Sequence, residues 1–320
     1  MTRKKGKAAL NVGDRSAVDA AEASVACVTE AELDDDSGDV EGEGDGSDVA
    51  FAPGPSADAF SEVSGCIDPE VLKLYDVYSY QHAAAILKNS FPTELLEIEN
   101  ALLNFKLSVR DIGNPGGNES DIPKKLSAML RPAGWLETRI QGDLVVRLLE
   151  QGESILTSGK TKKYKLPEKE HHTIKGYIDG HKIDYVKGRV SVDLEWNSKD
   201  QTYDRDLYAC RIFHECKVIS IAVLITRSEK LNDIFPNIPQ LSKNGSIVYN
   251  NNGKIKSVKS KYGASTTWMG KLLYRLNAGR HGGCPVLVFG IRPDIVTDYT
   301  IGQTLEQTVD LLKEGKNEGI

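Results

Sequence analysis

Three carboxylates have types and spacing that could support chemistry: Asp184, Asp193 and Glu195, in the segment HKIDYVKGRVSVDLEWNSKD at residues 181–200. Carboxylates that converge repel one another unless a cation lies among them. Oxygen ligands without a neighbouring His or Cys suit Mg²⁺, which takes one or two carboxylates and completes its shell with water and substrate phosphate. The acids therefore indicate phosphoryl chemistry. The alternative is a hairpin with one hydrated face, because short motifs often match by accident.

A β-hairpin with its turn at Lys187-Gly188 would position these acids. That turn pairs Lys182 with Asp193 and makes Asp184 a diagonal neighbour of Asp193, with Cβ atoms about 7 Å apart. Because side chains alternate along a strand, the three acids share one face. The opposite face is predicted to be apolar, with Ile183, Tyr185, Val190, Val192, Leu194 and Trp196.

Helices and strands alternate around this hairpin. A further turn is expected at Asp179-Gly180, and Thr93 is expected to cap a helix. Helices are predicted at 79–90, 92–107, 121–130 and 265–279, and buried strands at 218–226 and 285–291. Strands separated by helices indicate an α/β fold, a mixed β-sheet flanked by helices.

Charge divides the chain into two parts. Residues 1–64 contain 5 Lys/Arg against 15 Asp/Glu, whereas residues 65–320 contain 35 against 31. The first part is predicted to be a disordered acidic tail, because it has too little apolar surface to offset the entropy of ordering. The second part is predicted to be one folded domain whose slight positive charge is compatible with a nucleic-acid partner.

Cysteine spacing and hydropathy indicate the compartment. The five cysteines form no CxxC pair, and no apolar run approaches the length of a membrane span. The start of the chain lacks the apolar region of a signal peptide. A soluble, cytoplasmic protein is therefore expected.

A rival acidic motif lies further along the chain. Glu215-Cys216-Lys217 spells E-x-K before an apolar run, with Asp204 or Asp206 as a possible upstream acid. Lys is also favoured at the C-terminus of a helix by the helix dipole. A helix end is therefore the favoured interpretation of this motif.

Several long sequence segments identify a protein family more specifically than the three acids do. Four segments closely resemble the BglII and BstYI branch of type II restriction endonucleases: IDYVKGRVSVDLEWNSKDQTYDRDLYA, ISIAVLITR, KYGASTTWMGKLLYRLNAGRHGGCPVLVFGI and NPGGNESDIPKKL. This branch belongs to the PD-(D/E)XK superfamily and is related more distantly to BamHI. The resemblance runs from about residue 70 to about residue 296. It implies the PD-(D/E)XK nuclease core.

The resemblance also implies roles for the acids. Asp184 and Asp193 would be catalytic and hold Mg²⁺, although relatives usually carry Glu at the position of Asp193. Glu195 occupies the position where most of the superfamily has Lys, and would orient or deprotonate the attacking water. One of two helix acids, Glu97 or Glu99, would assist.

Three places are expected to contact DNA. The resemblance favours a polar loop after the acidic strand and the start of the 265–279 helix, whose hydroxyls could instead simply cap that helix. A basic loop suits phosphates. The predicted residues are Asn197, Ser198, Lys254, Lys256, Lys259, Lys261, Ser265, Thr266 and Thr267.

The function that this resemblance implies is a Mg²⁺-dependent type II restriction endonuclease. It would hydrolyse double-stranded DNA at a short palindrome with a central GATC, as a homodimer, because a two-fold symmetric site demands two-fold protein symmetry. A companion DNA methyltransferase is expected in the same system. The alternatives are a sequence-specific DNA-binding protein that has lost cleavage, against which the three acids argue, and a repair or recombination nuclease.

Overall fold

A computed structural model describes residues 54, 56–115, 121–263 and 265–314. The chain divides into two units, residues 1–46 and residues 47–320, and every described residue belongs to the second. The predicted disordered tail lies outside the described residues as far as residue 53. The domain boundary predicted at residue 64 falls inside helix α1 (Phe60–Cys66), where Val63 is 1% exposed, so the folded unit begins earlier.

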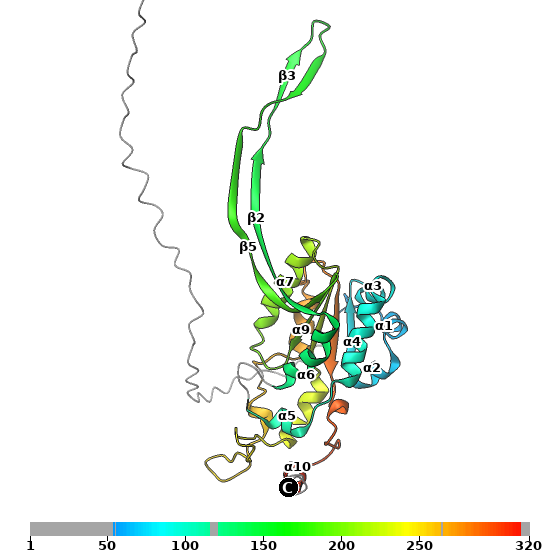
Figure 1. The fold of residues 1–320 in the computed structure, drawn as a ribbon, viewed down its shortest axis with the longest axis vertical. Helices are drawn as coiled ribbons and strands as arrows, with labels where there is room; N and C mark the ends of the chain where they lie inside the picture. Colours follow the sequence, from blue (N-terminus) through cyan, green and yellow to red (C-terminus); the bar gives the residue numbers. More distant parts are fainter. Residues whose placement is uncertain (1–53, 55, 116–120, 264, 315–320) are drawn as a thin grey trace, which may run out of the picture. The chain divides into compact units, whose positions relative to one another are not determined.

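A mixed six-stranded sheet forms the centre of this unit, in the order β1-β8-β7-β6-β5-β2. β6 (Val190–Glu195), β7 (Ile221–Arg227) and β8 (Val286–Ile291) are parallel to one another, and β1 (Tyr75–Tyr80) pairs antiparallel with β8. On the other side, β5 (Glu170–Lys187) pairs antiparallel with β6 and with β2 (Leu136–Leu148). The predicted mixed sheet flanked by helices is confirmed (Figure 1).

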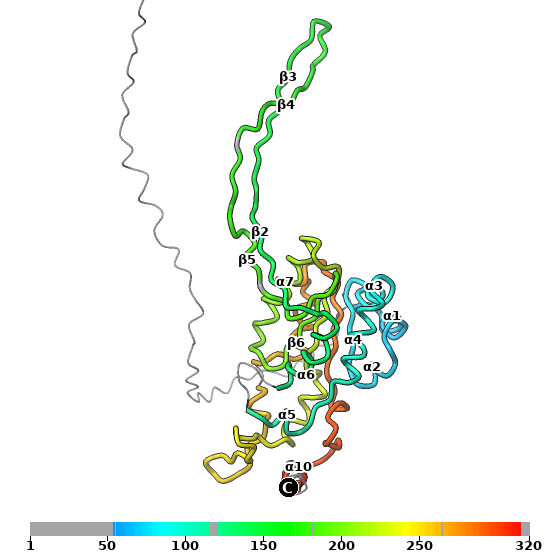
Figure 2. Tube along the Cα trace, viewed as in Figure 1, coloured from blue at the N-terminus to red at the C-terminus, as the bar shows by residue number. Residues whose placement is uncertain are grey.

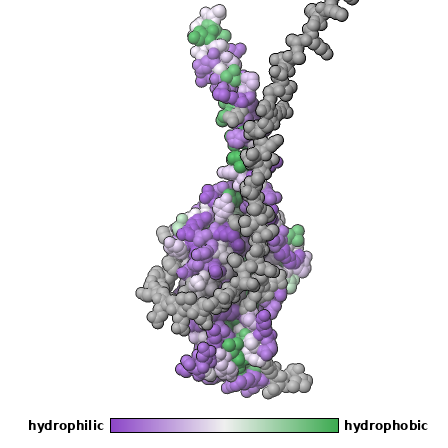
Figure 3. Space-filling view, turned by 90° about the vertical axis from the view of Figure 1, so that its left-hand side faces the viewer, coloured by the Kyte–Doolittle hydropathy of each residue, from purple (hydrophilic) through white to green (hydrophobic). Residues whose placement is uncertain are grey.

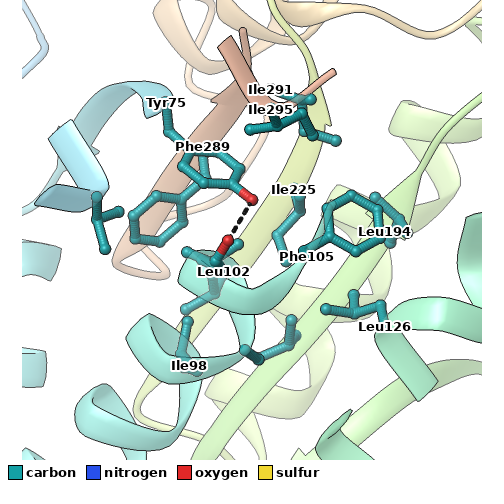
Figure 4. Packing of buried hydrophobic residues seen from close by; sticks show 14 of the residues in the cluster. Tyr75, Ile98, Leu102, Phe105, Leu126, Leu194, Ile225, Phe289, Ile291 and Ile295 are labelled. Carbon is teal, nitrogen blue, oxygen red and sulfur yellow. Dashed lines mark hydrogen bonds between the residues drawn. The ribbon is translucent and has the colours of Figure 1, made fainter. Parts of the chain in front are cut away.

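Two apolar cores cover the two faces of the sheet. On one face, Val192, Ile225 and Phe289 pack with the N-terminal helices, and the Tyr75 hydroxyl donates to the Leu102 carbonyl at 2.9 Å (Figure 4). The helices of this face are α1, α2 (Pro69–Leu74), α3 (Ala83–Ser90), α4 (Pro92–Asn104), α5 (Val109–Gly113) and α6 (Asp121–Leu130).

The second face is covered by α7 (Thr202–Glu215) and α9 (Met269–Asn277). Their apolar residues pack with Leu224 and Val288 of the central strands. The short helix α8 (Glu229–Asp233) follows β7, and α10 (Leu305–Glu314) comes last among the described helices. No helix in the described part of the chain is long and apolar enough to cross a membrane.

The β5–β6 hairpin forms, but its register differs from the prediction by two residues. Lys187 pairs with Val190, so the turn is Gly188-Arg189 and not Lys187-Gly188. A tight hairpin turn favours φ > 0 at its first central residue, and Gly188 adopts φ 55° there. The same register places Asp184 opposite Asp193 rather than diagonal to it.

The turn predicted at Asp179-Gly180 is wrong. β5 continues through both residues, and Asp179 pairs with Gln141 of β2. Register shifts between the two strands absorb the irregularity there. A local turn signal is overridden because a partner strand pairs with β5 along its length.

Helix boundaries depart from prediction in three places. Ser79 and Tyr80 belong to β1 rather than to the following helix, and Thr93 lies inside α4, which begins at Pro92. α9 begins at Met269 rather than at Ser265. The predicted helix at 121–130 is confirmed as α6.

A two-stranded ribbon extends from one edge of the sheet. β2 and β5 run side by side along it, and β3 (Gln151–Ile155) and β4 (Thr161–Lys165) form a separate hairpin between them in the sequence (Figure 2). Its side chains are largely exposed, with apolar residues such as Leu149, Ile155 and Tyr177 among polar ones (Figure 3).

Candidate active site

Four carboxylates meet on the face of the sheet that α7 covers. Alternation along β6 points Val192 and Leu194 into the first core and leaves Asp193 and Glu195 on the opposite face. The backbone N–H of Asp184 donates to Oδ1 of Asp193 at 2.8 Å. From α7, Asp206 shares a side-chain hydrogen bond with Glu195. The three predicted acids are therefore together, with Asp206 as a fourth.

A β-bulge beside Asp184 brings Ile183 to this same face. Between the pairs Thr138↔Ile183 and Leu136↔Val186, β5 holds one residue more than β2. Ile183 consequently packs with the α7 and α9 core, not with Tyr185 as predicted, because the extra residue reverses the alternation. Asp184, next along the chain, lies on the side of Asp193.

Negative charge in the cluster is only partly compensated, by Arg131 and by Arg205, whose Nε lies 3.6 Å from Oδ1 of Asp206. Asp193 and Asp206 are 8% and 7% exposed. Burial, and then the Asp184 and Asp206 charges, raise the pKa of Asp193 well above its ordinary value. Burial and the neighbouring Glu195 raise the pKa of Asp206 to about 8. The pKa of Asp184 and that of Glu195 are also raised, chiefly by loss of surrounding water.

Buried oxygens without partners mark the same place. Glu195 Oε2, Asp206 Oδ2 and Asn197 Oδ1 are inaccessible and accept no hydrogen bond from the described residues. A buried polar atom without a partner costs free energy unless a ligand, ion or water satisfies it. These oxygens, in a set without nitrogen or sulfur ligands, fit a hard cation such as Mg²⁺.

The carboxylates do not close into a compact cage. No three of the four bring oxygens within 4.8 Å of one another in the described chain. An ion here would therefore bind one or two of them and complete its shell with water and phosphate, as Mg²⁺ commonly does.

A different trio does meet that distance: Asp58, Glu62 and His82. Its atoms are already engaged, because Asp58 accepts from the Ser79 hydroxyl at 2.5 Å and Glu62 accepts from His82 Nδ1 at 3.0 Å. These bonds tie the start of the folded unit to the end of β1.

Two arginines at the margin of the acid cluster were not predicted. The charges of Arg131 and Arg205 oppose the rise in the pKa of Asp184, and Arg205 has the same effect on Glu195 and Asp206. The Arg131 guanidinium lies 4.7 Å from the centre of the Tyr185 ring. The sequence segments that contain these arginines, RPAGW and YDRDL, do not indicate that they lie beside the acids. Only the position of Arg205 on the helix after the acidic strand could have suggested it.

The two helix acids considered as assistants have other partners. Glu97 accepts from Lys187 Nζ at 2.6 Å and from the Trp135 indole at 2.9 Å. Glu99 accepts from the backbone N–H of Asp68 at 2.7 Å. Both belong to α4, which packs on the face opposite the acid cluster.

The two polar segments predicted to contact DNA lie side by side after β6. The N–H of Thr267 donates to the Ser198 carbonyl, and that of Asp200 to the Ser265 carbonyl, each at 2.8 Å. Lys199 and Thr266 form a β-bridge between them. The hydroxyls do not cap α9, because its N-cap is Trp268. Asn197, Ser198 and the 265–267 segment therefore form one surface beside Glu195, whose side chain bonds to Ser198.

The predicted basic loop is divided. Lys254, Lys256 and Lys259 are exposed. Lys261 instead donates to the carbonyls of Ile112 and Asn114 at the end of α5, and burial lowers its pKa to about 8. Lys261 therefore joins two segments of the protein, while the other three remain available to phosphates.

The E-x-K word at 215–217 is the end of a helix, as predicted. Glu215 is the last residue of α7 and accepts from Arg211 at 2.7 Å. Lys217 follows the C-cap with φ 62°. Among the described residues, no three potential metal ligands come together at this helix end.

The sheet and the acid cluster fall within one family match. The model of the restriction endonuclease BglII/BglIII family matches residues 75–291, from the first residue of β1 to the last of β8. The chain belongs to the BglII/BglIII restriction endonuclease family. Members of this family are type II site-specific deoxyribonucleases with double-stranded DNA as substrate, so the predicted resemblance and enzyme class are confirmed. A search of curated proteins finds no match.

Proposed function

We propose that this restriction endonuclease is Mg²⁺-dependent and cuts a short palindrome with a central GATC as a homodimer. The observation that carries the metal proposal is the acid cluster, in which Asp193 and Asp206 are buried and the nearby Arg205, 3.6 Å from Oδ1 of Asp206, leaves the pKa of both carboxyls raised. The residues present fit the ion by their oxygen donors and their partnerless atoms. A homodimer supplies one active site to each strand of a two-fold symmetric target.

Asp184 and Asp193 would hold the ion, since they lie opposite each other on the hairpin. When bound, it supplies positive charge at the scissile phosphate. Glu195 accepts a hydrogen bond from the attacking water and fixes its direction. Arg205 provides a cation beside the acids, where most of the superfamily has Lys on the strand itself. Asn197, Ser198 and the 265–267 segment contact the DNA.

Mapping of cut ends tests this proposal. The purified protein is incubated with a plasmid of known sequence in Mg²⁺ or in EDTA, and the ends are sequenced. We expect discrete cuts at one palindrome containing GATC, in Mg²⁺ only. Sequence-specific binding without cleavage in Mg²⁺ would favour the DNA-binding alternative. Cleavage at a palindrome whose central four bases are not GATC would overturn the GATC assignment.

Asp193→Asn provides the matched variant, because it removes a charged ligand while preserving volume. We expect cleavage to fall by about 10²–10³ while DNA binding persists, given the usual cost of removing transition-state charge stabilisation. Gel-shift and single-turnover assays on the same duplex measure the two properties. Near wild-type cleavage would show that the ion binds elsewhere.

A further inference from the structure

Arg227 is a buried cation at the end of β7. Its side chain is 0% exposed, and no carboxylate of the described chain pairs with it. Its guanidinium carbon lies 4.9 Å from the Tyr262 ring centre, 5.3 Å from Phe235 and 6.0 Å from Trp196. Aromatic faces attract the cation but replace an ion pair only in part. A buried charge without a counter-ion is costly unless hydrogen bonds satisfy it.

Those hydrogen bonds run to the proposed DNA-contacting surface. Nη2 donates to the Thr267 carbonyl at 2.6 Å and to the Thr266 hydroxyl at 2.7 Å. At the other end of the fork, Nη1 donates to Oδ1 of Asn232 at 2.8 Å. Arg227 therefore connects helix α8 on one side with the segment before α9 on the other.

The end of β7 is also bonded to the catalytic strand. Thr226, which precedes Arg227, donates from its hydroxyl to the Glu195 carbonyl at 2.9 Å. The segment held by Arg227 is in turn bonded to Ser198 and Asp200 after β6. Two adjacent residues of β7 thus bond to the backbone of Glu195 and to the surface beside it.

We infer that Arg227 is a positioning residue for sequence discrimination, which holds the 265–267 segment in the orientation that reads DNA. This inference rests on the proposed function of that segment. The guanidinium is suited to the task because its planar fork fixes two acceptors at once, whereas a lysine ammonium is a point charge on a flexible stem.

The test compares Arg227→Lys with Asn232→Ala. The first keeps the charge but lacks the fork, and the second removes one Arg227 hydrogen bond without touching the DNA surface. For each, kcat/KM is measured on the cognate duplex and on duplexes with one base pair changed, well below the melting temperature of the variant. We expect Arg227→Lys to lose at least about tenfold in discrimination, or about 1.4 kcal/mol, and Asn232→Ala to keep it.

Hydrogen exchange without DNA provides a second readout. In Arg227→Lys the Thr267 and Asp200 amides, which bond across the two segments, should exchange faster while β6 amides do not. Should Arg227→Lys fail to fold, Thr266→Val replaces it in the test. Thr266 is half-buried, and the substitution removes one hydrogen-bond acceptor of Arg227. Exchange of the same two amides is then measured in this variant. Unchanged discrimination between duplexes together with unchanged amide exchange would overturn the role of Arg227 but not the proposed function. Wild-type protein without site-specific cleavage would overturn the proposed function instead.

Discussion

Glu195 carries a negative charge at a position where a positive charge is more common. Where most of the superfamily has a cation on this strand, a carboxylate has one buried oxygen without a partner and shares a hydrogen bond with Asp206. A glutamate cannot steady phosphate charge, so in the proposed mechanism Glu195 acts through water or the metal. Its substitution separates two possible tasks, orienting a water molecule and removing a proton from it.

Glu195→Gln is expected to outperform Glu195→Ala in cleavage by at least about tenfold, or about 1.4 kcal/mol in barrier. The amide keeps an oxygen acceptor at the same reach, whereas alanine removes it. Single-turnover cleavage at saturating enzyme measures the difference. Equal inactivity of the two variants, with DNA binding intact, would instead make Glu195 the general base, because an amide has no useful basicity near neutral pH.

Arg205→Ala is expected to slow cleavage by about 10–100-fold, because it removes a cation placed beside the acids. Its control is Arg211→Ala on the same helix, whose guanidinium pairs with Glu215 at 2.7 Å. Both are measured by single-turnover cleavage with thermal melting as a folding check. Loss of activity in both variants alike would assign the effect to helix α7 rather than to the site.

At the scale of elements, the packing of α7 against β6 brings like charges together. Asp206 lies on the buried side of the helix, and its carboxyl is pressed against that of Glu195. The helix is held by Leu207, Cys210 and Phe213, which are fully buried in the second core. Apolar burial therefore maintains an electrostatically unfavourable contact, which a bound cation would relieve.

The stability of the metal-free protein is expected to fall as pH rises from about 4 to about 8. The folded state holds the Asp206 proton more tightly than the unfolded state, since the pKa of Asp206 is raised to about 8. Stability falls with pH wherever the folded state binds more protons.

Asp206→Asn should abolish much of this fall and melt higher than wild type at pH 8. Thermal denaturation in EDTA at about pH 5, 7 and 8 measures the melting temperature of each variant. Asp204→Asn is the control, because ion pairs with Arg275 and Arg280 lower the pKa of Asp204, so this variant should melt lower. A pH profile unchanged by Asp206→Asn would contradict the assignment.

Local signals were sufficient for part of the fold. Runs such as PVLVFGI predict buried strands because both faces are apolar, and the DIPKKLSAML helix was predicted at its observed bounds. The acids were placed on one face because alternation survives an even shift of register. Register itself depends on which turn residue adopts positive φ, and Gly188 decided it.

Other features depend on partners distant in the sequence. The bulge at Asp184 exists only in relation to β2, and β5 runs through Asp179-Gly180 because β2 pairs with it. Asp206 enters the site through the packing of α7, since its sequence neighbours suggest an ordinary solvated helix face. Such features follow from tertiary contacts that local patterns do not encode.

At the scale of the whole molecule, charge is divided between the two units. Residues 1–46 contain 12 Asp/Glu and five Lys/Arg, while the DNA-binding unit is less acidic. DNA repels negative charge, and the repulsion is strongest at low salt.

Deletion of residues 1–46 is therefore expected to leave sequence specificity unchanged and to give equal or tighter DNA binding, with the greater effect at low salt. Fluorescence anisotropy at two salt concentrations measures binding, and end mapping measures specificity. Loss of specific cleavage would assign the deleted residues to the working enzyme.

The pairing of β1 with β8 has a consequence for synthesis on the ribosome. β8 lies between β1 and β7, so until residues 286–291 are made β1 has no partner strand in the sheet and β7 has only β6. The chain between β1 and β8 is about 200 residues long, so at typical rates of 5–20 residues per second β1 waits roughly 10–40 s. The β2–β5 ribbon, in contrast, is complete within its own stretch of chain. The acid-bearing strand β6 is thus made well before β8 can complete the sheet around it.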